Sequence, residues 1–260
     1  MQQTHWNDIY HGNDPFTMTE AVVCKAGEGA LFTDPSYRPH LAQAAAGGHH
    51  AYAYYALHTG TAPEIAAQAR RAFMLIGARP AMYDAERWPA ESGSPAGMVS
   101  LPQLCSAIDA YRGLGGVMWV CYLPRSMWAL MGSPSLSPLA SRKIHIVNAD
   151  YQPGSETVGS PAWAPYGGVR PWAVQYKPCH NTAPGTWAQA QSVWERGVID
   201  APSPSPQPPA VHVVKSGETM ASIAAAAGVT LAALEKANPH AGHPAGNFNL
   251  IFPGDELVIP

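Results

Sequence analysis

Two carboxylates stand two positions apart in the segment PAMYDAERWP, at residues 80–89. An apolar run leads into Asp84, and an aromatic residue, Trp88, follows Glu86. If the run is a β-strand, residues two apart point to the same face, where two anions repel each other. Hydrolysis of a glycosidic bond uses two carboxyl groups that differ in protonation. The spacing therefore indicates a site that could cleave a sugar chain.

The elements that must position this pair can be predicted from the apolar runs. Runs rich in Val, Ile, Tyr and Trp predict strands at residues 6–11, 21–26, 50–57, 80–86, 116–123, 143–151 and 171–176. Ala-rich runs predict helices at 40–47, 62–77 and 101–115. This alternation favours a mostly parallel sheet, and at this size a closed (β/α) barrel. Helices become sparse after residue 123, so we expect the last part of the barrel to be irregular.

In such a barrel the active site lies at the carboxyl ends of the strands. The acids expected there are Asp8, Glu28, Asp84, Glu86 and Asp150. The aromatic residues expected at the same level are Tyr10, Tyr54 or Tyr55, Trp88, Tyr122, Tyr151, Trp172 and Tyr176. Any one such acid is more often a cap or a surface ion-pair partner than a catalyst. Several acids walled by aromatic rings, on which sugar faces stack, indicate a carbohydrate substrate.

Six segments of the chain follow the order of a known family. They are DIYHGND, VVCKAGEGALFTDPSY, GGHHAYAYYAL, PAMYDAERWP, GVMWVCYLPRSMWALMGSPSLSPLA and PWAVQY. Over roughly residues 5–180 the chain resembles glycoside hydrolase family 25. These Chalaropsis-type lysozymes cut the β-1,4 bond after N-acetylmuramic acid in peptidoglycan. The resemblance implies an α/β fold, an irregular TIM-like barrel of the β5α3-β3 type, and an enzyme that needs no cofactor or metal.

The resemblance also assigns roles to the acids. Glu86 matches the family's general acid, and Asp84 matches the partner that stabilises the developing cation by orienting the substrate's own N-acetyl group. Asp8 matches the acid of the first strand. The family's last strand supplies another acid, and here Asp200 fills that place, or Asp150 does, or neither does. Contacts with the substrate are expected from Tyr10, Tyr54, Trp88, Tyr122, Gln175 and Tyr176.

The chemistry of the pair agrees with these roles. A general acid must keep its proton near neutral pH. We expect the Asp84 anion and partial burial by Trp88 to raise the pKa of Glu86. Hydrogen bonds should keep Asp84 ionised.

The segment APSPSPQPPA, at residues 201–210, predicts an extended linker because proline alternates with small residues. It separates a catalytic domain at 1–200 from a small domain at 211–260. The small domain reads as strand, helix, helix, strand, and it is similar to a LysM module, which binds glycans containing N-acetylglucosamine. The residues that match the LysM groove are Gly217, Glu218, Thr219, Met220, Asn238, Pro239, Leu250 and Ile251. Of these, Gly217 and Asn238 could equally serve turn geometry.

Composition narrows the possible partners. The formal net charge is −3 and no Lys/Arg run occurs, so we expect neither a nucleic acid nor a membrane as partner. The four cysteines are far apart and two lie in apolar runs, which favours buried free thiols. The histidines show no metal-ligand spacing. A monomer is the default expectation.

The N-terminal segment shows no signal peptide. For an enzyme directed at the cell wall this favours a phage endolysin, which waits in the host cytoplasm and reaches the wall or periplasm through holin lesions. A virion-associated lysin and a bacterial enzyme exported by another route stay open. A non-catalytic wall-binding protein with a degenerate barrel is the main alternative from another class. A peptidase or amidase pairing a cysteine with His180 or His145 is a weaker one.

Overall fold

The structure is a computed structural model of the 260-residue chain. It describes residues 3–9, 21–177, 180–183, 186–188, 190–195, 210–227, 229–239, 241–242, 248 and 250–259. The chain divides into two compact units, residues 1–206 and 207–260. Apart from Ala210, the predicted linker lies outside the described residues.

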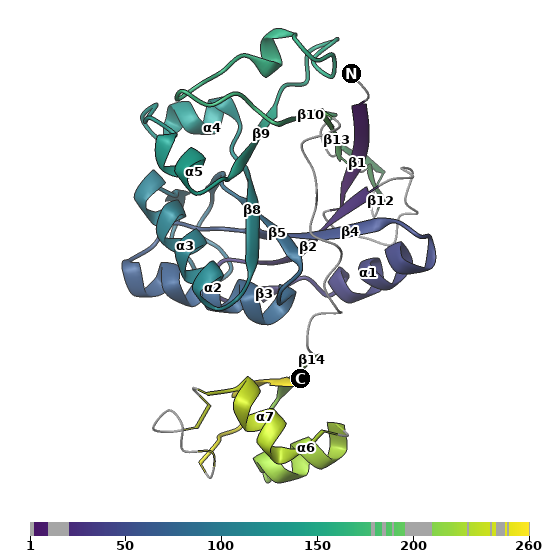
Figure 1. Ribbon diagram of the computed structural model, residues 1–260, viewed down its shortest axis with the longest axis vertical. Helices are drawn as coiled ribbons and strands as arrows, with labels where there is room; N and C mark the ends of the chain where they lie inside the picture. The colour runs from purple at the N-terminus through teal and green to yellow at the C-terminus, as the bar shows by residue number, and fades with distance from the viewer. Residues whose placement is uncertain are drawn as a thin grey trace. The chain divides into compact units, whose positions relative to one another are not determined.

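The strands of the first unit pair in a closed ring (Figure 1). Seven of them run parallel in the order in which they follow one another along the chain: β1 (Gln3–Ile9), β2 (Ala21–Glu28), β4 (His50–Ala56), β5 (Pro80–Asp84), β8 (Val117–Tyr122), β9 (His145–Ala149) and β10 (Ala173–Lys177). An antiparallel strand, β13 (Ala190–Glu195), closes the ring between β10 and β1. The predicted irregular barrel is therefore confirmed.

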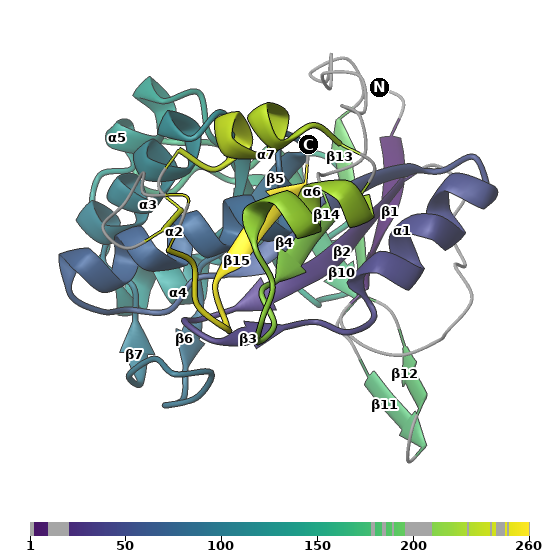
Figure 2. The same cartoon turned by 90° about the horizontal axis from the view of Figure 1, so that it is seen from below.

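The closing strand β13 lies upstream of the segment around Asp200 in which the sequence suggested a last strand. A short strand, β3 (Phe32–Thr33), adds to the edge of β2. Two hairpins complete the sheet structure: β6 (Arg87–Trp88) with β7 (Gly97–Met98), and β11 (His180–Ala183) with β12 (Thr186–Ala188). The β11–β12 hairpin projects away from the barrel strands (Figure 2).

Helices lie on the outer side of the strands. They are α1 (Tyr37–Ala46), α2 (Ala62–Ile76), α3 (Leu101–Gly113), α4 (Arg125–Leu130), α5 (Ser137–Ser141) and the 3-10 turn η1 (Pro161–Trp163). The first three confirm the helices predicted from the Ala-rich runs. Capping boxes start two of them, because Glu64 accepts the N–H of Thr61 at 2.6 Å and Gln103 accepts that of Ser100 at 2.8 Å. Figure 1 shows α2 and α3 side by side against the strands.

Alternation along the strands produces two apolar layers. Side chains such as Val22, Cys24 and Tyr83 pack outward with the helices. Their neighbours fill the inside of the ring, among them Val23, Tyr54, Met82 and Val120. Inward-facing positions near the carboxyl ends of the strands carry polar groups instead, namely Lys25, Asp84, Tyr122 and Gln175. The packed barrel therefore ends in a polar layer, where a site can form.

The thiols of Cys24, Cys105 and Cys121 are buried and free, as predicted. Burial raises the pKa of Cys24 to about 12, so its thiol stays protonated and unreactive. Cys179 lies outside the described residues.

The second unit is a βααβ fold. Strands β14 (Ala210–Val213) and β15 (Glu256–Ile259) pair antiparallel, and helices α6 (Met220–Ala227) and α7 (Leu231–Ala237) lie between them in the chain. Its core contains Val214, Met220, Ile223, Ala224, Leu234 and Leu257. Among the described residues no single helix is long and apolar enough to span a membrane, although the bent pair of α6 and α7 passes by length and composition.

Candidate active site

The acidic pair lies where strand β5 ends. Asp84 is the last residue of the strand, faces the inside of the barrel and is 8% exposed. Its backbone is fixed by the neighbouring strands, because its carbonyl oxygen accepts the N–H of Leu57 at 3.0 Å. The N–H of Ala85 donates to the carbonyl oxygen of Tyr122 at 2.9 Å. Glu86 comes two residues later and lies outside the strand, so the prediction that the strand includes Glu86 was wrong.

Glu86 is mostly buried, and this controls its protonation. Burial raises the pKa of its carboxyl from 4.5 to about 6, while the positive charge of Lys25 opposes the rise. The prediction of a raised pKa caused by burial is confirmed. The contribution expected from the Asp84 anion stays a prediction. A carboxyl with this pKa is part protonated near neutral pH and can act as a general acid.

Two tyrosines, Tyr122 at the end of β8 and Tyr151 two residues after β9, line the same end of the barrel. The hydroxyl groups of Tyr122 and Tyr151 both donate to Oε1 of Gln175, at 2.9 and 2.7 Å. Burial raises the pKa of Tyr122, and the negative charge of Glu86 raises it further, which shows that the two groups influence each other. Tyr122 stands directly beside Asp84 in the register of β5 and β8. The predicted contacts Tyr122 and Gln175 thus meet at the acidic pair.

A buried ion pair lies on β2, which only β4 separates from β5. Lys25 is 1% exposed, and its Nζ lies 2.5 Å from Oε2 of Glu28. Lys25 and Glu28 are three residues apart, and a bulge in β2 between Lys25 and Gly27 lets both of their side chains face inward. Glycine is required at position 27, because a Cβ there would lie 2.6 Å from the carbonyl oxygen of Phe32. Glu28, expected among the strand-end acids, is thereby committed to an ion pair.

His58 and Ser92 complete the environment of Glu28. The hydroxyl of Ser92 donates to Oε1 of Glu28 at 2.8 Å, and Nε2 of His58 lies 3.3 Å from the same oxygen. Gln68 on α2 fixes the backbone of His58 through two hydrogen bonds, of 2.9 and 3.0 Å. Although burial alone would raise the pKa of Glu28, the contact with His58, the hydrogen bonds from Lys25 and Ser92 and the charge of Lys25 hold it well below 4.5. Glu28 is therefore an anion under ordinary conditions.

Sequence reasoning missed Lys25 and His58. A lysine inside the apolar run AVVCKA was the available signal, since a buried lysine needs a partner. Nothing local marked His58, which meets Glu28 only through the pairing of β2 with β4.

Ligand atoms of Glu28, His58 and Glu91 lie within 4.8 Å of one another, a spacing that a metal ion could bridge. The ammonium of Lys25 already supplies the positive charge at Glu28. We therefore assign no metal to this cluster, and the absence of metal and cofactor stays a prediction.

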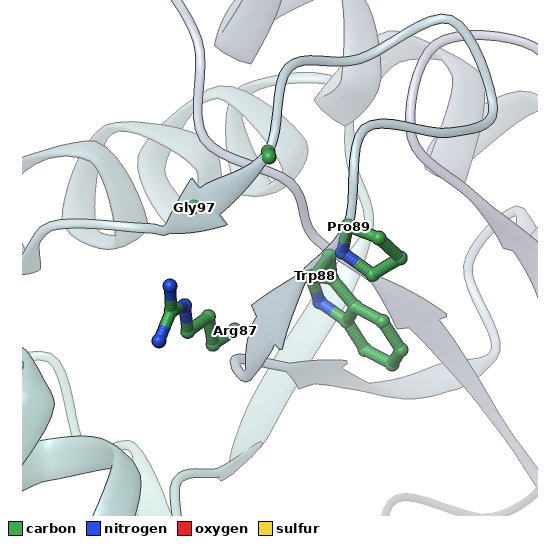
Figure 3. Close-up of a pocket in the computed structure, with 5 residues that line it drawn as sticks. Arg87, Trp88, Pro89 and Gly97 are labelled. Atoms are coloured by element: carbon green, nitrogen blue, oxygen red, sulfur yellow. The ribbon is translucent and has the colours of Figure 1, made fainter.

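A shallow hollow of about 380 Å³ follows the acidic pair along the chain. Arg87, Trp88, Pro89, Ala96 and Gly97 line it, all from the β6–β7 hairpin and the loop between its strands. Figure 3 shows the side chains of Arg87 and Trp88 pointing in opposite directions from β6. The ring of Trp88 stacks on His58, with centroids 5.5 Å apart and 11° between the planes. Trp88 thus links the hollow to the buried ion pair.

The remaining predicted residues are less clearly placed at the site. Asp8 lies on β1, whose backbone pairs it with Val23 and Ala190. Tyr54 is buried in the inner core, two residues before the end of β4, and Tyr176 lies on β10, partly buried. Asp150 follows β9, where its Oδ1 accepts the N–H of Gln152 at 3.1 Å and so caps a turn. Tyr10 and Asp200 lie outside the described residues.

In the second unit, four of the predicted groove residues are exposed: Gly217, Thr219, Pro239 and Leu250. Glu218 accepts the N–H of Lys215 at 2.7 Å and lies 2.6 Å from Nε2 of His212. Ile251 is partly buried.

Two other predicted groove residues support the fold of this unit. Met220 is part of its core. The Asn238 side chain donates to the carbonyl oxygens of Leu234 and Val258 and accepts the N–H of Val258, with distances of 2.7 to 2.8 Å.

Comparison with known proteins agrees with the division of the chain into a barrel and a small C-terminal unit. Residues 212–260 match the family model of the LysM domain. No curated protein matches the chain in sequence. Among solved structures, the first unit superimposes on the bacterial lysozyme of Streptomyces coelicolor with a TM-score of 0.53 and 19% identity, over 73% of this chain and 90% of that one. This is the fold of the family 25 lysozymes.

Two further structures share the family 25 fold. The muramidase of Acremonium alcalophilum is 20% identical, with a TM-score of 0.51 over 75% of this chain and 94% of its own. A family 25 glycosyl hydrolase of Bacillus anthracis is 13% identical, with a TM-score of 0.51 over 75% of this chain and 89% of its own. The chain thus joins a barrel of the family 25 fold to a LysM domain.

Proposed function

We propose that this protein is a peptidoglycan hydrolase, an N-acetylmuramidase that cleaves the β-1,4 bond between N-acetylmuramic acid and N-acetylglucosamine. The observation that carries the proposal is the pair at the end of β5: buried Asp84 beside Glu86, whose pKa lies at about 6. The family 25 fold around the pair supports the reaction type. The LysM domain at 212–260 supports the same polymer as substrate.

The proposed reaction begins with a proton transfer from Glu86. As the bond from the anomeric carbon to the bridging oxygen breaks, the Glu86 carboxyl gives its proton to that oxygen, which leaves as a hydroxyl group. Asp84 stabilises the positive charge that develops on the sugar, by orienting the substrate's N-acetyl group. Water then adds to the anomeric carbon and returns a proton to Glu86. The net change is one bond hydrolysed and one reducing end formed.

The LysM domain would hold the enzyme on its substrate. Binding of a glycan by this unit raises the local concentration of wall polymer seen by the barrel. The exposed Thr219, Pro239 and Leu250 are available for that contact. Affinity for insoluble wall and turnover on soluble fragments are therefore expected to depend on different units.

The proposal is tested by digesting purified peptidoglycan and identifying the new reducing ends by mass spectrometry. We expect reducing N-acetylmuramic acid from the wild type and none from Glu86→Gln. Asp109→Asn serves as a matched control, because Asp109 lies on α3 with an exposed side chain and pairs with Arg142 at 2.7 Å. Binding to the wall without new reducing ends would support a non-catalytic wall-binding protein instead. Released peptides would mean that the bond type is wrong.

We further propose that the activity serves host lysis by a bacteriophage, with the enzyme held in the host cytoplasm until holin lesions open the way to the wall. This is supported by the resemblance to the family 25 lysozymes and by one structure of similar fold, the CTP1L endolysin, at 14% identity and a TM-score of 0.50 over 74% of this chain and 66% of that one. Expression in a host with and without a holin tests it. Lysis that needs the holin supports the role, and lysis or secretion without it would contradict it.

A further inference from the structure

We propose that His58 is a positioning residue for the substrate: its buried ring stacks on Trp88 and fixes the plane of the aromatic wall that receives a sugar ring. The proposal rests on the proposed function, because it gives Trp88 a sugar to bind. It assigns to His58 the orientation of that wall, which the roles of Asp84 and Glu86 in the reaction do not specify.

Trp88 lies on a hairpin that is too short to fix its ring alone. Strands β6 and β7 have two residues each and pair outside the barrel sheet, and an isolated two-stranded hairpin is at best marginally stable in water. The loop between them is tied to the β2–β3 turn, because the carbonyl oxygen of Ser92 accepts the N–H of Leu31 at 2.9 Å. The hydroxyl of Ser94 likewise accepts the N–H of Ala30 at 3.0 Å. These bonds hold the loop, so other groups must place the ring of Trp88.

Stacking, and not a hydrogen bond, sets the plane of the Trp88 ring. Its Nε1 is buried and has no hydrogen-bond partner among the residues that the structure describes. The ring lies nearly parallel to that of His58, with 5.5 Å between the centroids and 11° between the planes, which is the offset stacking that aromatic pairs prefer. The Lys25 ammonium also approaches the ring, at 5.9 Å from its centroid. A single charge constrains the ring less than a second flat ring does.

His58 can anchor Trp88 because it is itself held by two elements of the barrel. Its side chain is fully buried, and its Nε2 lies 3.3 Å from Oε1 of Glu28 on β2. The buried side chain of Gln68 on α2 accepts the backbone N–H of His58 at 2.9 Å and donates to its carbonyl oxygen at 3.0 Å. The backbone and the ring of His58 are thus fixed independently, and the stack passes this rigidity to Trp88.

The held ring lies where the substrate is expected. Trp88 comes two residues after Glu86, is partly exposed and lines the hollow of about 380 Å³ beside β6 (Figure 3). A pyranose ring presents a face of C–H groups, which packs on an aromatic ring as other apolar surfaces do. A Trp88 ring that turned freely would have to be ordered each time a sugar binds, and that ordering would weaken binding.

The test measures kcat and KM of the full-length protein on soluble peptidoglycan fragments in two variants with opposite properties. His58→Gln removes the ring but keeps a donor for Glu28, whereas His58→Phe keeps a flat ring and removes that donor. Both keep the bonds from Gln68, because these go to the backbone. Loss of an aromatic pair corresponds to about fivefold in an equilibrium constant, so His58→Gln should raise KM about fivefold. His58→Phe should keep the wild-type KM, and kcat should change little in either variant, because the wall binds substrate and transition state alike.

A double-mutant cycle shows whether His58 acts through Trp88. Trp88→Ala should raise KM by itself, and adding His58→Gln to it should raise KM no further. A matched control is His145→Gln, because the His145 ring also contacts a tryptophan, with its centroid 5.4 Å from that of Trp172. His145 is the first residue of β9, at the end of the barrel opposite the acidic pair, so its variant should keep the wild-type KM.

Failure of the inference differs from failure of the proposed function. In an active enzyme, three results each overturn the role of His58 and leave the muramidase intact: a wild-type KM in His58→Gln, a raised KM in His58→Phe, or a further rise when His58→Gln is added to Trp88→Ala. An inactive wild type overturns the function.

Near-ultraviolet circular dichroism decides the placement of the ring without any activity. The signal of Trp88 is isolated in each protein by subtracting the spectrum of the same protein with Trp88→Phe. This signal should be lost in His58→Gln and kept in His58→Phe, because a ring that is no longer held in one plane loses its fixed asymmetric surroundings. An unchanged Trp88 signal in His58→Gln refutes the positioning role.

Discussion

Glu86→Gln should make the barrel more stable at alkaline pH while removing its activity. The carboxyl of Glu86 has a pKa of about 6 in the folded chain and 4.5 as a reference for the unfolded chain. Between these values the folded state binds more protons, so the free energy of unfolding falls as pH rises from 4.5 to 6. Above pH 6 the full penalty of burying the charged carboxylate is present. A glutamine carries no charge and escapes that penalty.

The size of the effect follows from the shift. A difference of about 1.5 units corresponds to about 2 kcal/mol, at about 1.36 kcal/mol per unit. For a unit of about 200 residues, 1 kcal/mol changes Tm by about 2–4 °C. The variant should therefore melt about 4–8 °C above the wild type at pH 8. At pH 4, where Glu86 is mostly protonated, the difference should nearly vanish.

Differential scanning calorimetry of both proteins at pH 4 and pH 8 measures this directly. Every other titrating group contributes equally to both proteins, so the change of the Tm difference with pH isolates Glu86. Asp109→Asn is a control of opposite sign, because its exposed ion pair with Arg142 lowers the pKa of Asp109 and stabilises the ionised form. That variant should lose less than about 1 kcal/mol at pH 8. A Glu86→Gln difference that is the same at both pH values would refute the burial argument.

Three further predictions concern other parts of the chain. Asp84→Asn should lower kcat on soluble fragments by about 10²-fold or more with little change in KM, because the charge that stabilises the transition state is lost; steady-state kinetics checks this, and an unchanged kcat would contradict it. Asn238→Ala removes three hydrogen bonds, at 2.7 to 2.8 Å, and should lower the free energy of unfolding of the LysM domain by about 3 kcal/mol. Denaturant unfolding followed by circular dichroism should show this loss of stability in the LysM domain and none in the barrel. Leu250→Asp changes a side chain that is 42% exposed and should weaken binding to insoluble peptidoglycan while leaving turnover of soluble fragments at the wild-type rate. A sedimentation assay measures the binding and steady-state kinetics measures the turnover, and a loss of both would contradict the prediction.

The sequence predicts much of this architecture because its signals are local. Apolar runs mark the seven parallel strands, and Ala-rich runs mark α1, α2 and α3. The closing strand β13 was not predicted from the sequence, because AQSVWE mixes small, polar and aromatic residues without a continuous apolar run. The predicted end of β5 was two residues too late, since no feature of the amino-acid sequence shows where its pairing with β8 stops.

The residues of the site also divide into those that a local sequence pattern shows and those that only tertiary pairing brings together. The Asp84–Glu86 pair is visible in the sequence because its members are neighbours. The ion pair of Lys25 with Glu28 depends on a bulge in β2, and its contact with His58 depends on the register of β2 against β4. Such contacts are set by tertiary pairing and leave no local pattern. For the same reason Met220 and Asn238 match a binding motif in sequence yet lie within the fold of their unit.

The most direct test of the account is the pH profile of kcat/KM for the wild type on a soluble peptidoglycan fragment, which avoids the effect of LysM on insoluble wall. If Glu86 is the general acid in the environment described, activity should fall on the alkaline side with an apparent pKa of about 6. The profile should contain no such limb in Glu86→Gln. An alkaline limb that persists in the residual activity of Glu86→Gln, or a wild-type profile that stays flat from pH 5 to about pH 8, would contradict the assignment of Glu86.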